Sequence, residues 1–538
     1  ELYDAYGQAA SAVEHIRETE EATRLARERY LAAGRPVDAA RMLLWLASVS
    51  GREADPVTRR LELVDQALLE IGRLPASAAR ESLERELLSV RASWRLDASR
   101  IDDGVADAAQ ARRLAEAADD RELALDATVT QARIDIATGQ VDAGLARGLR
   151  AARDARDAGF ESVGVTAFRN LAAWAARVLD HGTAEAAIRE GIRYADAIEQ
   201  SHCRQQMATT SALLAWAAGR WEDADEIARQ ELVERGCRRG MLGAMDVLGF
   251  VAMGRGRVGD AHRWLDESLE GGRRTNEIQM ILPPAWGLAE LDLVAGLPDR
   301  AAARCMEVLE LAVDAGERSL LLPYVVTGTR AWLAARQPDQ ADRWLDRTTA
   351  HLAGWERVAG PAIAHATGLL RLSTGTVGAA REALETAATG WDGRGRTWEA
   401  LWARLDLAHC LMRSNRFGEA ASLLAIVRSR AEAMASLPLL ARVTELARIG
   451  RGRGAPEEPW RPLTIREFEV ARLIAQGMTN SEIADELRIA PKTASAHVEH
   501  ILAKLGAARR AEIATWVASV TAPTDGPRGS RATVAVTR

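Results

Sequence analysis

The sequence predicts an all-α fold, in which a long α-solenoid precedes a small separate helical domain. Three observations support this prediction. Ala, Leu, Arg and Glu, which favour helices, dominate the 538 residues. An element of about 40 residues recurs through roughly the first 430 residues, as is typical of repeat architectures. A stretch rich in Gly and Pro then separates the repeats from about 60 residues that carry helix-start signals of their own.

The recurring element is a small or polar turn residue that is followed, after four residues, by Ala. Its clearest copies are GRWEDA, GRVGDA, GLPDRA, RQPDQA, GTVGAA and NRFGEA, at 219–224, 256–261, 296–301, 336–341, 375–380 and 415–420. The alanines of these copies are 37 to 40 residues apart, and fainter copies precede them. This period accommodates two helices with their turns, so each repeat is expected to be a helical hairpin.

The first clear copy shows how such a hairpin would form. An apolar helix at 210–218 is expected to end at Gly219, which suits a left-handed C-cap. The apolar face of a second helix at 223–232 consists of Ala224, Ile227, Ala228 and Leu232. The small side chain of Ala224 lets the first helix approach closely. Because one hairpin cannot bury its apolar side alone, neighbours are expected to stack into a superhelix over residues 1–448.

These repeats resemble tetratricopeptide-like (TPR-like) solenoids, although their period exceeds 34 residues and is nearer that of HEAT-type repeats. The resemblance implies a sensor or interaction domain that takes a small-molecule or protein effector. Trp264 and Trp344 each lie three residues after the repeated Ala. We interpret these tryptophans as core packing, and the alternative is that some tryptophans line a concave groove for a ligand.

The composition argues against several other classes of protein. No apolar run approaches the length of a membrane span and there is no signal peptide, so we expect a cytoplasmic protein without a membrane partner. The four cysteines lack a CxxC spacing and are expected to be reduced, mostly buried thiols rather than metal ligands. The G-x-S-x-G and H-E-x-x-H motifs are absent. We therefore expect no catalytic site, no cofactor and no metal in this chain.

Lysine usage bears on nucleotide binding. Lys492 and Lys504 are the only lysines, and every other basic residue among the 70 Lys and Arg is an arginine. A P-loop requires a lysine, and none precedes Lys492. The chain begins at Glu1 rather than Met. An ATPase module could therefore only lie before Glu1, in a longer protein.

Gly, Pro and charged residues alternate between the repeats and the C-terminal domain. Pro456 and Pro459 block a helix there, so we predict an interdomain linker at 449–461. The last residues, 521–538, have a composition typical of a disordered tail.

Residues 462–520 are predicted to form four helices. Thr464-x-x-Glu467 and Thr479-x-x-Glu482 are capping-box signatures that open the first two helices. A third helix, 491–504, begins with a first-turn proline and is closed by Gly506, and a fourth follows from about 509. A short helix, a tight turn and a further helix with a polar face indicate a helix-turn-helix motif, whose second helix enters the DNA major groove.

The third predicted helix is amphipathic. Its apolar stripe consists of Ala494, Val498, Ile501 and Leu505, and it is expected to pack on Phe468, Leu473, Ile483 and Leu487. Both lysines of the chain lie outside this stripe. Residues 488–510 carry five basic side chains against the single acidic Glu499, which suits contact with phosphate.

The stretch 463–506 resembles the LuxR-type DNA-binding domain. The resemblance rests on LTIRE (463–467), GMTNSEIA (477–484), KTASAHV (492–498) and KLG (504–506). It implies a four-helix LuxR-type helix-turn-helix domain that binds double-stranded DNA, with the fourth helix, 508–519, pairing two copies on the DNA. The sequence departs from the family at Ala490, where Ser is usual, and at Ala494, where Val is usual.

The resemblance also implies roles for individual residues. Positions that usually contact the phosphate backbone are occupied by Lys492, Thr493, His497 and Lys504. Positions that usually face base edges are occupied by Ser495, Ala496 and Glu499, and His500 flanks the same face. Glu499 cannot bind phosphate, and would instead accept a hydrogen bond from a cytosine amino group. A pH switch is an alternative role for His497.

A long helical repeat followed by this domain resembles the large ATP-binding LuxR (MalT-like) regulators, in which a nucleotide-binding module precedes the repeats. We therefore predict a DNA-binding transcriptional regulator that acts as a homodimer on promoter DNA and is controlled through its helical repeats. The alternative is a helical-repeat protein-interaction scaffold with a secondary DNA-binding domain.

Overall fold

The computed structural model describes residues 1–12, 16–52, 56–98, 100–234, 237–453 and 462–521. Within these ranges the chain forms α-helices and one short 3-10 helix, η1 (Ser319–Leu321), and no strand. The predicted all-α fold is confirmed. The chain divides into two compact units, Glu1–Leu446 and Ala447–Arg538, each described by itself below.

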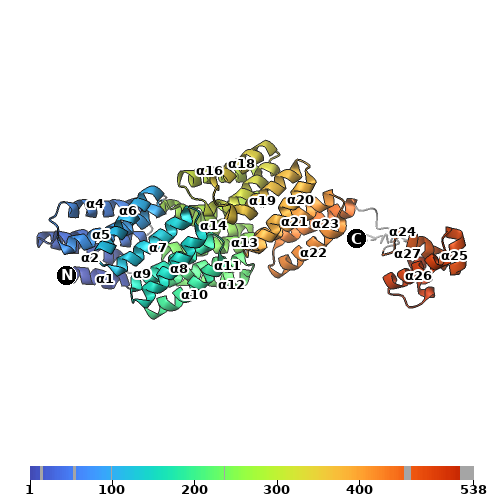
Figure 1. Cartoon of the computed structure of the whole chain (residues 1–538), viewed down its shortest axis with the longest axis horizontal. Helices are drawn as coiled ribbons and strands as arrows, with labels where there is room; N and C mark the ends of the chain where they lie inside the picture. The colour runs from blue at the N-terminus through green and yellow to red at the C-terminus, as the bar shows by residue number, and fades with distance from the viewer. Residues whose placement is uncertain (13–15, 53–55, 99, 235–236, 454–461, 522–538) are drawn as a thin grey trace, which may run out of the picture. The chain divides into compact units, whose positions relative to one another are not determined.

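The first unit is a series of antiparallel helical pairs (Figure 1). Its first helices are α1 (Leu2–Ala12), α2 (Ile16–Ala32), α3 (Pro36–Arg52), α4 (Val57–Gly72), α5 (Ala78–Asp97), α6 (Ile101–Ala117), α7 (Arg121–Ala137) and α8 (Val141–Asp157). The middle helices are α9 (Glu161–Arg177), α10 (His181–Ala197), α11 (Ser201–Ala217), α12 (Trp221–Val233), α13 (Arg238–Gly254), α14 (Val258–Thr275), α15 (Ile278–Val294) and α16 (Pro298–Asp314). The series continues with α17 (Leu322–Ala334), α18 (Pro338–His351), α19 (Glu356–Ser373), α20 (Val377–Asp392), α21 (Thr397–Arg413), α22 (Phe417–Ala433) and α23 (Leu437–Arg453).

The repeated Ala lies where the two helices of a pair meet. These alanines, Ala224, Ala261, Ala301, Ala341, Ala380 and Ala420, are each 0% exposed. The turn residues that open the same motifs have positive φ; they are Gly219, Gly256, Gly296, Gly375, Arg336 and Asn415. Glycine adopts this left-handed conformation without steric cost, which explains its recurrence at the helix end. The predicted hairpin repeat is confirmed.

The two tryptophans that follow the repeated Ala differ in their surroundings. Trp344 is 1% exposed and its Nε1 donates a hydrogen bond to the Val325 carbonyl at 3.1 Å. Trp264 is only half-buried, and the Arg263 guanidinium lies 4.8 Å from its ring centroid. The interpretation as core packing is therefore confirmed for Trp344, whereas Trp264 lies at the edge of the packed interior.

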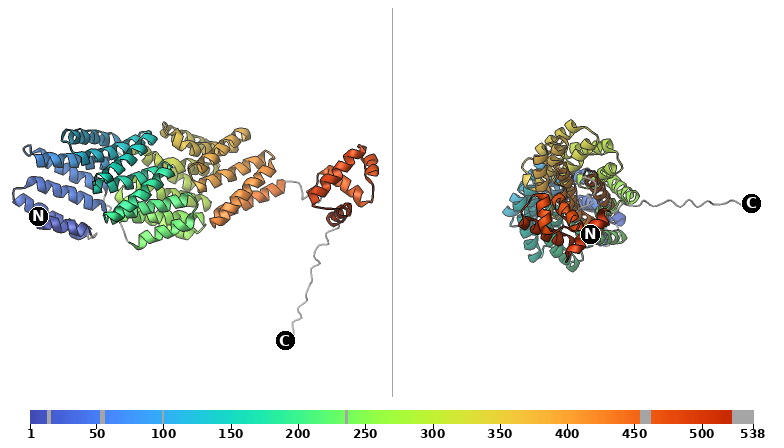
Figure 2. Two further views of the ribbon diagram at one scale, coloured as in Figure 1. Left: turned by 60° about the horizontal axis from the view of Figure 1, so that its bottom comes forward. Right: turned by 90° about the vertical axis from the view of Figure 1, so that its right-hand side faces the viewer.

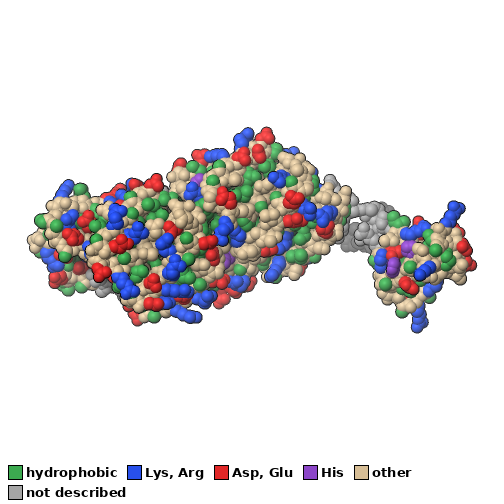
Figure 3. Space-filling view, in the orientation of Figure 1, with side chains coloured by type: hydrophobic (Ala, Val, Ile, Leu, Met, Phe, Trp, Pro, Cys, Tyr) green, Lys and Arg blue, Asp and Glu red, His purple; other side chains and the backbone are tan. Residues whose placement is uncertain are grey.

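Residues that are 181 to 217 positions apart in the sequence form hydrogen bonds with each other in the solenoid. Arg60 forms a buried ion pair with Glu277. Farther along the unit, the Ser436 hydroxyl donates to the Gly254 carbonyl at 2.8 Å. The turns thus pack against one another, as the close spacing of the helices in Figure 2 also indicates. Acidic and basic side chains are interspersed on the visible face of this unit (Figure 3).

The end of the solenoid differs slightly from the predicted boundary. Helix α23 continues through Arg453, inside the segment predicted as a linker at 449–461. The residues before Pro456 contain helix-forming Ala, Ile and Arg, so the helix can continue until the prolines approach. Residues 454–461 of the predicted linker, and 522–538 of the predicted disordered tail, lie outside the described residues.

The structure also bears on other classes of site. Across the described ranges, none of the helices combines the length and apolar character that a bilayer span requires. The same residues contain no group of three or more His, Cys, Asp or Glu arranged to hold a metal ion. The cysteines are free thiols, and Cys203, Cys305 and Cys410 are buried.

A buried carboxyl group on α13 makes the stability of the solenoid depend on pH. Asp246 is 7% exposed, and burial raises its pKa to about 8. An aspartate in an unfolded chain titrates near pH 4, so between about pH 4 and 8 the folded state binds this proton and the unfolded state does not. The free energy of unfolding therefore falls as pH rises through this window.

We expect Asp246→Asn to raise the free energy of unfolding at pH 8 by at least about 2 kcal/mol and to leave it nearly unchanged at pH 4. Urea denaturation of the full chain at both pH values measures this. Asp346→Asn, at an exposed aspartate on α18, is the matched control and should change neither value by more than about 0.5 kcal/mol. If the stability of Asp246→Asn depended on pH as that of the wild type does, Asp246 would not be the group responsible for this pH dependence.

Candidate nucleic-acid interface

The second unit contains four helices, α24 (Ile465–Ala475), α25 (Asn480–Leu487), α26 (Pro491–Leu505) and α27 (Arg510–Thr521). Figure 1 draws them at the red end of the colour scale. Helices α24 and α25 begin directly after Thr464 and Thr479, each through a reciprocal capping box. Helix α26 begins at Pro491 and ends before Gly506, whose φ is 64°. The predicted helix signals are therefore confirmed.

An apolar core holds the four helices together. Of the predicted stripe on α26, Ala494, Val498 and Ile501 are at most 8% exposed, and Leu505 is half-buried. The residues predicted to receive the stripe, Phe468, Leu473, Ile483 and Leu487, belong to the same cluster. Ile513 and Val517 of α27 complete the cluster. The apolar face of α26 thus points inward, which leaves its polar face toward solvent.

The turn between α25 and α26 sets the angle between the two helices of the motif. Arg488 ends α25 in the left-handed conformation, with φ of 52°. Ala490 then precedes α26 with extended backbone, and its side chain supplies no cap. The Arg466 guanidinium donates to the Leu487 carbonyl at 3.0 Å, so α24 also anchors this turn. A short helix, a tight turn and a following helix are the elements of a helix-turn-helix motif.

A polar network fixes α26 against its neighbours. The Asn480 side-chain amide donates to Ser495 Oγ at 3.1 Å. The Arg510 guanidinium donates to Asn480 Oδ1 at 2.6 Å and also to the Met478 carbonyl. Three helices are therefore connected through Asn480. Arg510, counted among the basic groups of 488–510, thus faces inward rather than toward a ligand.

The polar face of α26 is open to solvent in this unit. Of the predicted interface residues, Lys492, Thr493, Ala496, Glu499, His500 and Lys504 are exposed, and Ser495 and His497 are half-buried. All eight lie on one helix, so the structure brings the whole predicted set together. Among the described residues, the Lys492 ammonium has no hydrogen bond or ion pair, so it is available to a ligand.

Lys504 differs from the rest of the predicted set because it has an internal partner. Its ammonium donates to both carboxylate oxygens of Glu467, at 2.7 and 2.8 Å. Burial raises the pKa of Glu467, but the Lys504 ammonium and the Thr464 hydrogen bonds outweigh this effect and hold the pKa at about 2. The Lys504 side chain is 40% exposed and that of Glu467 is 7% exposed. The structure thus gives Lys504 a role in holding α26 on α24, and its phosphate contact remains a prediction.

Sequence reasoning missed three residues that position the interface. Glu467 was identified only as a helix cap, whereas it also binds Lys504, 37 residues away. Asn480 was not identified, and Arg510 was identified only as one of the basic side chains of 488–510, although together they hold Ser495 in place. A capping box has a local signature, but the pairing of side chains from different helices has none.

The geometry defines a class of protein domain: a four-helix domain with a helix-turn-helix motif, whose second helix has a polar, partly basic face. Comparison with known proteins identifies the family. Residues 461–517 match the family described as bacterial regulatory proteins, luxR family, and the C-terminal domain of this chain is a LuxR-type domain.

Two relatives illustrate how far this similarity extends. The HTH-type transcriptional regulator Mb0914c of Mycobacterium bovis is 41% identical over 66 residues, which are 12% of this chain and 8% of that protein. The nitrate/nitrite response regulator protein NarL of Escherichia coli is 39% identical over 71 residues, which are 13% of this chain and 33% of NarL. The match thus spans a third or less of the length of these two relatives.

The solenoid resembles a solved structure in fold. A Rap protein, crystallised in complex with competence and sporulation factor, superimposes with a TM-score of 0.50 and 13% sequence identity. The superposition covers 65% of this chain and 99% of the Rap chain. At this identity the likeness concerns the helical-repeat fold alone.

Proposed function

We propose that this chain is a transcriptional regulator that binds double-stranded promoter DNA by inserting α26 into the major groove. The observation that carries the proposal is the polar face of α26, exposed on a LuxR-type domain, with the Lys492 ammonium free to bind. A helix of this kind fits the width of the major groove. The relatives named above are regulators, and no catalytic role is proposed for this chain.

The proposed contacts divide into two groups. Lys492, Thr493 and His497 bind backbone phosphates, and Lys504 extends this group from the other end of the helix. Ser495, Ala496 and Glu499 face base edges, with His500 beside them. Ser495 Oγ accepts a hydrogen bond from Asn480, so its own proton remains available for a base acceptor. The Glu499 carboxylate would accept a hydrogen bond from a cytosine amino group.

The regulator acts as a homodimer on DNA in this proposal. One small domain makes few phosphate contacts, and nonspecific binding of this kind has a Kd on the order of 10⁻⁴–10⁻⁶ M at physiological salt. Two domains on half-sites one helical turn apart combine their contacts. An effector bound to the helical repeats would control whether the two domains can pair.

Lys492→Ala tests the docking face. We expect it to lower the affinity of the full chain for duplex DNA about tenfold and to reduce the slope of log K against log salt by about 1 per domain, because one phosphate contact is lost. Titration of labelled genomic fragments between about 50 and 200 mM salt measures both quantities.

Arg472→Ala is the matched control, because Arg472 is an exposed basic residue that lies on α24 rather than on α26. It should preserve affinity and salt slope. If Lys492→Ala also preserved them, α26 would not be the docking helix. If the wild-type chain bound no DNA fragment while retaining protein partners in a pull-down, the scaffold alternative would replace the proposed function.

A further inference from the structure

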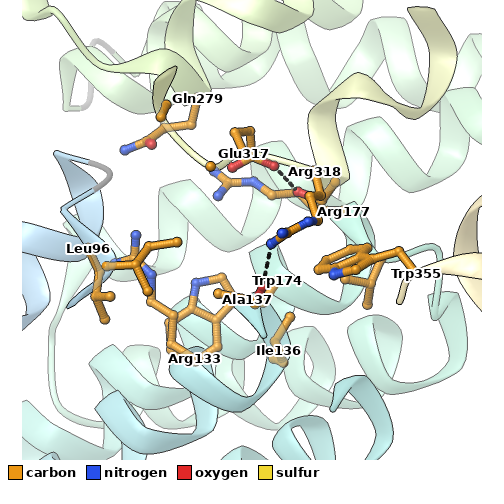
Figure 4. Close-up of a pocket in the computed structure, with 15 residues that line it drawn as sticks. Leu96, Arg133, Ile136, Ala137, Trp174, Arg177, Gln279, Glu317, Arg318 and Trp355 are labelled. Carbon is orange, nitrogen blue, oxygen red and sulfur yellow. Dashed lines mark hydrogen bonds between the residues drawn. The ribbon is translucent and has the colours of Figure 1, made fainter. Parts of the chain in front are cut away.

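A cavity lies between successive turns of the solenoid. Its walls come from α7 and α9 on one side, and from the connection between α16 and α17 and the start of α19 on the other (Figure 4). The cavity has a volume of about 80 Å³ and opens to solvent. A cavity of this size accommodates one small group of a ligand, whose remaining atoms would extend toward the open mouth.

The surroundings of the cavity carry more positive than negative charge. Five arginines lie in the cavity wall or in the ion-pair network behind it: Arg60, Arg133, Arg177, Arg239 and Arg318. Three carboxylates accompany them: Asp97, Glu277 and Glu317. Buried or partly buried charge is costly unless it is paired, so an excess of cations at this depth favours an anion.

The carboxylates already have partners. Asp97 accepts a hydrogen bond from Arg133 at 2.7 Å. Glu317 accepts from the Ser319 hydroxyl at 2.6 Å and from the Leu320 amide at 3.1 Å. Because Glu317 accepts from neutral donors, two arginines of the wall, Arg177 and Arg318, have no carboxylate bound to them in the described part of the chain.

Glu277 is likewise occupied. It forms ion pairs with Arg60 and with Arg239, and its side chain is 1% exposed. It therefore pairs with two guanidinium groups behind the cavity, and its second oxygen accepts from the Gln279 side-chain amide at 3.3 Å.

Arg318 donates to the His351 and Ala137 carbonyls at 3.1 and 3.4 Å, so Arg177 is the one of the two without a partner among the described residues. Its guanidinium lines the cavity, and among the described residues it makes no hydrogen bond and no ion pair. Burial lowers the pKa of Arg177, the nearby Glu317 raises it, and the neighbouring Arg133 and Arg239 lower it further. A guanidinium group offers five donors in a planar fork that matches a carboxylate or a phosphate.

A second donor without a partner lines the same cavity. The Trp355 indole Nε1 is buried and has no hydrogen-bond partner within the described structure. Trp174 and Ile136 add apolar surface to the wall. Arg133 lies 5.9 Å from the Trp174 ring centroid, so it holds this ring in place. The wall thus combines anion-binding donors with flat apolar side chains.

We propose that this cavity binds a small organic anion, a carboxylate or phosphate group carried on a flat apolar body. Arg177 binds the anionic group, Trp355 Nε1 donates a further hydrogen bond, and the body lies against Trp174 and Ile136. Because the walls belong to two turns of the superhelix, the ligand ties these turns together. That this contact is the effector signal for DNA binding rests on the proposed function.

Phenyl phosphate and benzoate are suitable anionic probes, and benzamide is their neutral counterpart. Isothermal titration of the full chain is expected to detect saturable binding of at least one anion, with at least tenfold weaker binding of benzamide. Arg177→Gln should lower the affinity for the anion at least about tenfold, because a charge-assisted hydrogen bond is lost. Arg193→Gln, at an exposed arginine on α10, should bind the anion like the wild type.

The relative affinities of phenyl phosphate and benzoate show which anionic group the site takes. Equal binding by the wild type and Arg177→Gln would overturn the proposal, as would equal binding of benzamide or no binding by either anion. Thermal unfolding confirms that each variant is folded. DNA titration is carried out separately, so anion binding without DNA binding would reject the proposed function and retain this site.

Discussion

Lys504→Ala is expected to destabilise the C-terminal domain rather than only to weaken its contact with DNA. The substitution leaves the 7%-exposed Glu467 carboxylate without its cationic partner and releases α26 from α24. The pKa of Glu467 falls from an ordinary 4.5 to about 2, which corresponds to roughly 3 kcal/mol if the whole shift is lost. In the variant, the Thr464 hydrogen bonds still lower the pKa of Glu467, and solvent screens the partly exposed Lys504 in the wild type. We therefore expect the free energy of unfolding of the domain to fall by about 2 kcal/mol. That is a large fraction of the stability of a domain of this size.

Hydrogen exchange of the amides in α24 and α26, within the full chain, measures this loss. Glu467→Gln should produce a similar loss, whereas Lys492→Ala should leave exchange unchanged and lower only DNA affinity. If Lys504→Ala kept the exchange pattern and reduced the DNA salt slope by about 1 per domain, Lys504 would be a phosphate contact instead of a structural one.

The same ion pair has a defined pH dependence. The folded pKa of Glu467 is lower than its unfolded value, so the pair stabilises the domain fully above about pH 4.5 and progressively less as pH falls toward 2. The wild-type domain should therefore lose more stability than the Lys504→Ala variant over that range.

Gly272→Ala is expected to cause the largest destabilisation in the solenoid. Gly272 lies near the end of α14, where a Cβ atom would be 2.6 Å from the Met280 carbonyl carbon and even closer to its oxygen. The obstacle is backbone rather than a flexible side chain, so α14 and α15 must separate. Overpacking of this kind costs about 1–3 kcal/mol, and the repeats depend on contact with their neighbours. We therefore expect the free energy of unfolding to fall by about 3 kcal/mol, as measured by urea denaturation of the full chain.

Gly259→Ala, in the same helix, is the matched control. A Cβ atom at Gly259 would meet no atom within 4 Å, and Ala is the better helix former there by roughly 0.5–1 kcal/mol. We expect this variant to be as stable as the wild type or slightly more stable. A Gly272→Ala variant that matched it would show that α14 and α15 do not pack as described.

The amino-acid sequence by itself determined the local features of this protein. The repeated Ala, the turn residues with positive φ, the capping boxes at Thr464 and Thr479 and the apolar stripe of α26 all follow from interactions between residues a few positions apart. Local propensity, helix capping and periodicity act over this range, so the sequence displays them directly. The eight predicted interface residues share one helix and were identifiable for the same reason.

Only the tertiary structure decided which distant side chains meet. The pairing of Lys504 with Glu467, and of Arg60 with Glu277, depends on the packing of separate helices. In the solenoid, each repeat is rotated slightly relative to its neighbour, and these rotations accumulate over many repeats. The accumulated rotation determines which turns of the superhelix are in contact and places Arg177 at a cavity. The sequence of one repeat does not reveal the accumulated rotation, so the cavity between the turns could not be predicted from the sequence.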